Sequence, residues 1–202
     1  MICWRCANQV SEGGAFCPRC GHNLTEIGLS PIFVVDTATD LFNGVFIKAM
    51  IGQEVNRALR YRRPVAVLMV EVDHAESMRN DLRPDEVSRL LRQIGQSLVA
   101  ALRDTDTVGF VTGSSPPTFA VVLPETAHSE AIQVADALRL AVSFQDFADG
   151  GPWQRLTVSI GTAVINHERL GEQDLMQEAG AALADGRGSE PGTNRTFVPA
   201  RA

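Results

Sequence analysis

The sequence predicts an α/β fold, more closely an α+β sandwich in which helices flank a mixed sheet, with a small metal-binding ribbon at the N-terminus. Apolar runs typical of strands alternate with stretches whose apolar residues repeat at helical spacing. Two of the apolar runs flank a cluster of Gly, Ser and Pro, which indicates a hairpin. All four cysteines stand within the first twenty residues, in two Cys-x-x-Cys pairs.

The composition is typical of a globular protein of 202 residues, enough for one ordinary domain and a small appendage. The formal net charge of −6 argues against a nucleic-acid-binding protein, which needs a basic face. No apolar run reaches membrane-spanning length, and the first residues do not resemble a signal peptide. We therefore expect a cytoplasmic protein that binds neither nucleic acid nor membrane.

The cysteines predict a zinc ribbon over residues 1–23. Cys3 with Cys6, and Cys17 with Cys20, each place two thiolates on one tight turn, and two such turns complete a tetrahedral zinc site. Because four thiolates leave no open coordination position, we expect the Zn²⁺ to be structural. The alternative is a pair of disulfides, which a cytosolic chain with this spacing disfavours. We expect the ribbon to act as a cap or to contact a protein partner.

Residues 24–35 show no helical periodicity and are interpreted as a linker to the main domain, residues 36–202. The first predicted helix is capped by Thr39 or Asp40 and ends before Pro64, which cannot continue it.

The run Val65–Val72 is almost continuously apolar, as expected for a central strand buried on both faces. Glu71 stands at its end and Asp73 just beyond it, so their side chains share one side of the strand. The stretch Pro84–Leu102 has one apolar stripe at helical spacing and predicts the next helix.

The hairpin follows, with strands predicted at Val108–Val111 and Phe119–Leu123, and the next helix begins at Thr126 or Ser129. The last predicted elements are a strand at Leu156–Val164, a helix at Glu172–Leu183 and a strand at Thr196–Val198. This order fits a ferredoxin-like plan with additions.

Several stretches, in chain order, match short motifs that occur together in one protein family. They are Asp36–Asn43 with D-x-L-T-G-L-x-N, Val65–His74 with the run into D-x-D-H, Phe119–Pro124 with the strand after the signature, Thr157–Gly161 with T-V-S-I-G, and Gly192–Arg195 with G-R-N-R. Over about Asp36 to Val198 the chain therefore resembles the GGDEF or diguanylate cyclase domain. The resemblance implies a nucleotide-cyclase-like fold in which two subunits join two GTP molecules into cyclic di-GMP, with divalent metals held by carboxylates. It likewise implies a homodimer.

The chain departs from the family at the functional positions. The signature aligns with Ser115–Phe119, which reads Ser-Pro-Pro-Thr-Phe and lacks both the glycines and the acids. Glu71 replaces the first metal-binding Asp, whereas Asp73 is retained. By resemblance, Asp85 matches a guanine-binding Asp and Arg187 a phosphate-binding Lys. With the signature acid missing, we interpret Glu71 and Asp73 as strand-end residues that face solvent.

Arg103 and Asp106 repeat the R-x-x-D pattern of the family's inhibitory site, which binds cyclic di-GMP. An arginine can contact a guanine edge with two hydrogen bonds, and an aspartate can accept from its ring N–H groups. The alternative is a helix that ends in an arginine, followed by an aspartate in a loop.

Three functions remain open. The one we favour is a catalytically inactive GGDEF-like signalling module that senses a nucleotide, cyclic di-GMP or GTP, or binds a protein. The second is an active diguanylate cyclase with rebuilt ligands, which would use Mg²⁺. The third is a structural adaptor that binds no nucleotide.

Overall fold

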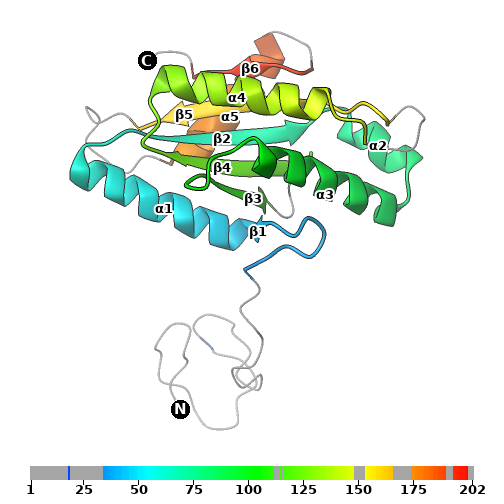
Figure 1. Ribbon diagram of the computed structural model, residues 1–202, viewed down its shortest axis with the longest axis horizontal. Helices are drawn as coiled ribbons and strands as arrows, with labels where there is room; N and C mark the ends of the chain where they lie inside the picture. The colour runs from blue at the N-terminus through cyan, green and yellow to red at the C-terminus, as the bar shows by residue number, and fades with distance from the viewer. Residues whose placement is uncertain are drawn as a thin grey trace. The chain divides into compact units, whose positions relative to one another are not determined.

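The computed structural model describes residue 18 and residues 34–111, 114, 116–147, 153–165, 174–189 and 193–199 (Figure 1). The chain divides into two units, Met1–Phe33 and Val34–Ala202. The predicted zinc ribbon, with Cys3, Cys6, Cys17 and Cys20, lies outside the described residues. The description below concerns the second unit.

The strands described in this unit form one mixed sheet in the order β1-β3-β4-β2-β5-β6. The central strand β2 pairs antiparallel with both β4 and β5, whereas β1 with β3 and β5 with β6 are parallel. The hairpin prediction is confirmed, because β3 and β4 are antiparallel neighbours. The strands are Phe42–Asn43 (β1), Val65–Val72 (β2), Thr107–Val111 (β3), Thr118–Pro124 (β4), Val158–Val164 (β5) and Thr196–Phe197 (β6).

Helices cover both faces of the sheet. One face packs against α3 and α4, and the other packs against α1 and α5. Among the described residues, no helix is both long and apolar enough to cross a membrane. The helices are Gly44–Tyr61 (α1), Ala75–Asp81 (α2), Pro84–Ala100 (α3), His128–Ser143 (α4) and Leu175–Ser189 (α5).

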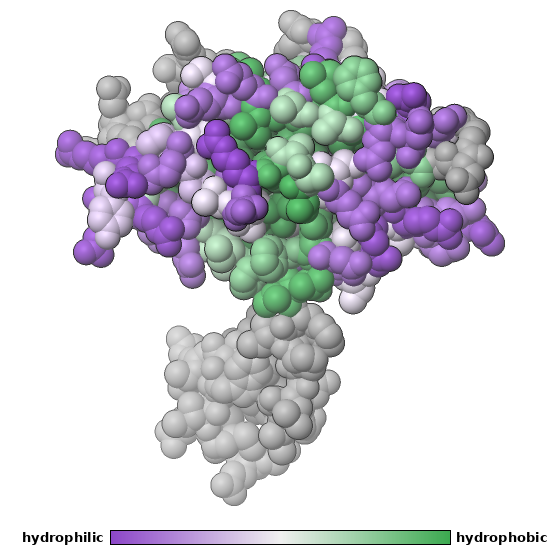
Figure 2. All heavy atoms as spheres, viewed as in Figure 1, coloured by the Kyte–Doolittle hydropathy of each residue, from purple (hydrophilic) through white to green (hydrophobic). Residues whose placement is uncertain are grey.

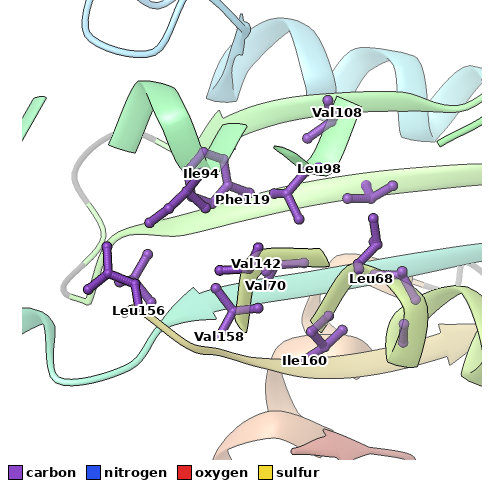
Figure 3. Close-up of a cluster of buried hydrophobic side chains, with 14 of the residues drawn as sticks. Leu68, Val70, Ile94, Leu98, Val108, Phe119, Val142, Leu156, Val158 and Ile160 are labelled. Atoms are coloured by element: carbon purple, nitrogen blue, oxygen red, sulfur yellow. The ribbon is translucent and has the colours of Figure 1, made fainter. Parts of the chain in front are cut away.

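The continuous apolar run of β2 supplies side chains to both faces of the sheet. Leu68 and Val70 belong to the cluster with α3 and α4, which Figure 3 shows together with Phe119, the residue opposite Val70 in β4. Val65 and Val67 belong to the opposite cluster, with α1 and α5. All five side chains have almost no exposed surface. The predicted strand, buried on both faces, is therefore confirmed.

The start of α1 differs from the prediction. The cap is Asn43, whose side-chain oxygen accepts a hydrogen bond from the Phe46 N–H at 2.9 Å. Thr39 instead donates its backbone N–H and its hydroxyl to the Asp36 carboxylate, each at 2.9 Å. That turn lets residues 42–43 pair with β3 before the helix begins. This long-range pairing leaves no periodic signal in the sequence.

Two other helices also differ from the sequence-based expectation. The helix α2 was not predicted, because seven residues are too few for a helical stripe, although Ala75 and Met78 are buried. The helix α5 continues past the predicted end at Leu183, as far as Ser189.

Close contact between α5 and β5 explains the glycine of the T-V-S-I-G stretch. A Cβ at Gly161 would lie 2.1 Å from the Ala179 carbonyl oxygen and 2.8 Å from Leu183 Cβ. Real Cβ atoms do not approach backbone oxygens so closely, so the helix can rest on the strand only where the side chain is absent. Gly161 is thus a packing requirement.

We predict that Gly161→Ala destabilises the fold by about 2 kcal/mol or more, because α5 must move away from β5. Gly52→Ala is the matched control, since a Cβ at Gly52 meets nothing within 4 Å in α1. In this control the free energy of unfolding is expected to rise by up to about 1 kcal/mol, because alanine has a higher helix propensity than glycine. Urea denaturation measures both. Equal unfolding midpoints for the two variants would contradict the packing argument.

Candidate functional site

The end of β2 gathers polar groups from distant parts of the chain around Asp73, which is 3% exposed. Asp73 Oδ1 accepts hydrogen bonds from Ser159 Oγ and from Arg187 Nη2, both at 2.8 Å. Asp73 Oδ2 accepts from Thr157 Oγ1 and from the Asn194 backbone N–H, also at 2.8 Å. Each carboxylate oxygen therefore has two described donors.

Arg187 connects this aspartate to Glu71. Its Nη1 lies 2.9 Å from Glu71 Oε2, while its Nη2 contacts Asp73, so one guanidinium bridges both carboxylates. Burial raises the pKa of the Glu71 carboxyl above its ordinary value of 4.5. The positive charge of Arg187 opposes this rise, and the negative charge of Asp73 adds to it. On balance, the folded environment disfavours ionised Glu71 even with the arginine present.

The expectation that Asp73 faces solvent is wrong. The backbone N–H of Asp73 donates to the Thr157 carbonyl at 3.0 Å, which extends the pairing of β2 and β5 beyond Val72. The side chain therefore lies against β5 and the end of α5. The missed partners Thr157 and Ser159 have a sequence signal, since two hydroxyl residues at alternate positions of the predicted strand Leu156–Val164 share one face.

The hairpin tip, Pro116–Thr118, contributes structural contacts. The Pro117 carbonyl accepts a hydrogen bond from the Val72 N–H at 3.1 Å. Thr118 is opposite Glu71 in the sheet register, but its hydroxyl donates to the Pro116 carbonyl at 2.9 Å, and the residue is 4% exposed. The side chain across from Glu71 is therefore a buried hydroxyl, and no acid stands in the tip sequence.

These residues do not fit Mg²⁺, the metal that the family resemblance implies. Magnesium needs near-octahedral oxygen ligands, chiefly carboxylates and water. Here a guanidinium already contacts both carboxylates, and Asp73 accepts hydrogen bonds on both oxygens. Among the described residues, no group of three or more His, Cys, Asp or Glu is placed to hold a metal ion.

Asp85, the other predicted nucleotide-site residue, lies in the first turn of α3. Its carboxylate is 3.8 Å from Arg83 Nε, and both side chains are largely exposed. Arg83 Nη2 also lies 3.4 Å from Glu86, whose side chain accepts the Arg83 N–H. The described contacts of Asp85 are thus those of a helix N-terminus, where acidic residues are favoured.

Arg103 and Asp106 lie together at a second place, between the end of α3 and the start of β3. Asp106 Oδ2 accepts the Arg103 N–H at 3.0 Å, and the Asp106 N–H donates to the Arg103 carbonyl at 3.0 Å. Asp106 Oδ1 is buried and has no hydrogen-bond partner among the described residues. Because α3 ends at Ala100, both residues lie in the loop that follows it, and the arginine does not end the helix as the alternative interpretation of this pattern expects.

The same two residues line a hollow of about 380 Å³. Its walls include the exposed side chains of Val35 and Val99. Figure 2 shows an apolar area between hydrophilic margins on one face of this unit. The volume of this hollow, and its lining of apolar and charged side chains, are typical of a site for a small molecule. The lining residues are Val35, Asp40, Leu41, Phe42, Val99, Leu102, Arg103, Asp104, Asp106, Thr107 and Val108.

Comparison with known proteins gives a family match over most of the chain. The family model described as "Diguanylate cyclase, GGDEF domain" matches residues 33–190. The response regulator PleD of Caulobacter vibrioides is 25% identical over 158 residues, which are 77% of this chain and 34% of PleD. This chain therefore corresponds to about a third of that relative.

Solved structures show the same fold. The diguanylate cyclase SiaD of Pseudomonas aeruginosa, in complex with its activator SiaC, has a TM-score of 0.73 at 24% identity, covering 82% of this chain and 62% of SiaD. The GGDEF domain of DgcB from Caulobacter crescentus, in complex with c-di-GMP, has a TM-score of 0.70 at 18% identity. The match covers 82% of this chain and 92% of the DgcB chain. At these identities the likeness concerns the fold.

We predict that Asp73→Asn destabilises the domain by about 3 kcal/mol, because it leaves Arg187 partly uncompensated and turns an amide N–H₂ toward donors. Glu71→Gln is the control and is expected to cost less than about 1 kcal/mol, since the site already disfavours the Glu71 charge. Chemical denaturation at neutral pH compares them. A larger loss for Glu71→Gln would show that Asp73 is not the centre of this cluster.

Proposed function

Because the chain belongs to the GGDEF family of diguanylate cyclase domains, we propose that it is a catalytically inactive member that acts as a signalling module. In this function the domain binds a nucleotide or a protein partner and does not join two GTP molecules. The observation that carries the proposal is the hairpin tip, where Pro117 and Thr118 stand in place of the acidic residues of the signature.

The chemistry of the tip supports this proposal. Phosphoryl transfer with two metal ions needs carboxylates that hold the ions beside the phosphates. Pro116 and Pro117 have neither an acid nor a backbone N–H, and the Thr118 hydroxyl already donates to Pro116. An active cyclase, the alternative, would need metal ligands other than those at the tip. A structural adaptor, the third possibility, would bind no nucleotide.

We expect no cyclic di-GMP when the full chain is incubated with GTP and either Mg²⁺ or Mn²⁺, because no signature acid is available to hold the metals. Chromatography of the products, with an active diguanylate cyclase assayed in parallel, gives the readout. Glu71→Gln is assayed as well, because a substitution in this chain would not change the activity of a contaminating enzyme. Product formation that disappears in this variant would overturn the proposal.

A second candidate function, cyclic di-GMP binding, is favoured by the hollow beside Arg103 and Asp106. The guanidinium of Arg103 can meet a guanine edge or a phosphate, and Asp106 Oδ1, which has no partner within the described part of the chain, can accept a guanine N–H. A ligand that satisfied this buried oxygen would remove the cost of leaving it unpaired. The apolar walls would contact the faces of the bases.

If the hollow binds cyclic di-GMP, Arg103→Ala should weaken the affinity at least about tenfold, the equivalent of one charge-assisted contact. Isothermal titration calorimetry measures the affinity for the natural chain and for the variant. Arg155→Ala is the matched control, because it removes an exposed arginine that pairs with Asp146 at 3.0 Å and does not line the hollow. Equal affinities for all three proteins would exclude this site.

The N-terminal cysteines complete the proposed module. We propose that Cys3, Cys6, Cys17 and Cys20 hold a structural Zn²⁺, whose binding would supply folding free energy to a segment too short to bury a sizeable core. The ribbon would then offer a surface to a protein partner. A homodimer is proposed on the resemblance to the family alone.

A further inference from the structure

We propose that Arg187 is the built-in counter-cation of the Glu71–Asp73 pair and that this arginine keeps the end of β2 free of divalent metal. The inference deepens the proposed loss of catalysis, on which it rests, because it assigns a second physical cause to a residue outside the hairpin tip. The inference explains why Glu71, Asp73 and Arg187 together do not form a site for Mg²⁺, the metal that the family resemblance implies.

The first argument is geometric. The two terminal nitrogens of one planar guanidinium lie 2.9 Å from Glu71 Oε2 and 2.8 Å from Asp73 Oδ1. A divalent ion shared by the two carboxylates would need the same space between those oxygens. The guanidinium thus places a positive charge and two N–H donors where such an ion would lie.

The second argument is the anchoring of Arg187. Arg187 lies in the last turns of α5, the helix that packs on β5 at Gly161. A Cβ at Gly186 would lie 2.1 Å from the Phe197 ring, so a glycine just before the arginine lets the end of α5 approach β6 closely. The packing of α5 thus places the guanidinium over the end of β2.

The third argument is electrostatic. The Asp73 side chain is 1% exposed, and those of Glu71 and Arg187 are 22% and 31% exposed, so their charges are weakly screened. A divalent cation added beside Arg187 would be repelled at short range in a medium less polarisable than water. Without the arginine, two neighbouring carboxylates would need another cation or a proton. The arginine is therefore the element that decides what the pair can bind.

One consequence concerns nucleotides. A guanidinium committed to two carboxylates is not directed at phosphate, although Arg187 aligns with a phosphate-binding lysine of the family. Because Arg187 contacts both carboxylates, a guanine nucleotide that binds at this end of the sheet should have neither this arginine nor a carboxylate-bound Mg²⁺ on its phosphates.

The test is titration of Mn²⁺ into the full chain, with free Mn²⁺ followed by electron paramagnetic resonance. Arg187→Gln keeps hydrogen-bonding capacity but loses the charge. This variant should bind one Mn²⁺ ion at the end of β2 with an affinity at least about tenfold higher than that of the natural chain. Arg187→Lys keeps the charge and should gain none. The double variant Arg187→Gln/Glu71→Gln should lose the gained site. Arg57→Gln is the matched control, since Arg57 pairs with the single carboxylate of Glu54 at 3.0 Å.

Two results would overturn the inference. One is a folded Arg187→Gln protein, verified by circular dichroism, that gains no Mn²⁺ site. The other is Mn²⁺ binding by the natural chain that Glu71→Gln abolishes, a comparison that stays decisive if Arg187→Gln does not fold. Either result leaves the proposed lack of catalysis intact. Conversely, a GTP-derived product from the natural chain would refute inactivity without requiring any change in these Mn²⁺ measurements.

Discussion

The buried carboxylate of Asp73 is the constraint on which the functional end of this domain depends. A charge that is 3% exposed is costly unless it is paired and hydrogen-bonded, and here the donors come from β5, from α5 and from the segment before β6. Satisfying one side chain therefore holds three separate segments beside the end of β2. The arrangement stabilises the C-terminal part of the fold at the end of β2.

The hairpin keeps its pairing and packing although its tip sequence contains no acidic residue. In β4, Phe119 is fully buried and packs against Phe110 with ring centroids 5.2 Å apart. The Pro117 carbonyl still accepts a hydrogen bond from Val72, so the sheet pairing continues to the edge of the tip. Core packing and backbone pairing in this hairpin therefore do not depend on acidic side chains at the tip.

The two candidate sites differ in what they can recognise. The cluster at the end of β2 has its charges compensated internally, since Arg187 bridges Glu71 and Asp73. The hollow beside Arg103 combines apolar walls with a buried carboxylate oxygen, Asp106 Oδ1, that has no described partner. A group with unmet hydrogen-bonding capacity gains more from a ligand than one that is already satisfied. This contrast makes the hollow the better place for a small molecule.

The sequence by itself determined the class of fold, the hairpin, the central strand buried on both faces and the family. Apolar periodicity and short motifs depend only on residues that are close together in the sequence. It also identified Glu71, Asp73 and Arg187 as candidates, one by one. Only the tertiary structure decided that Arg187 lies between the two carboxylates and that Asp73 is buried under donors from β5 and residue 194. Those contacts join residues more than eighty positions apart. They follow from the packing of α5 and the sheet register, and no local pattern encodes which distant side chains then meet.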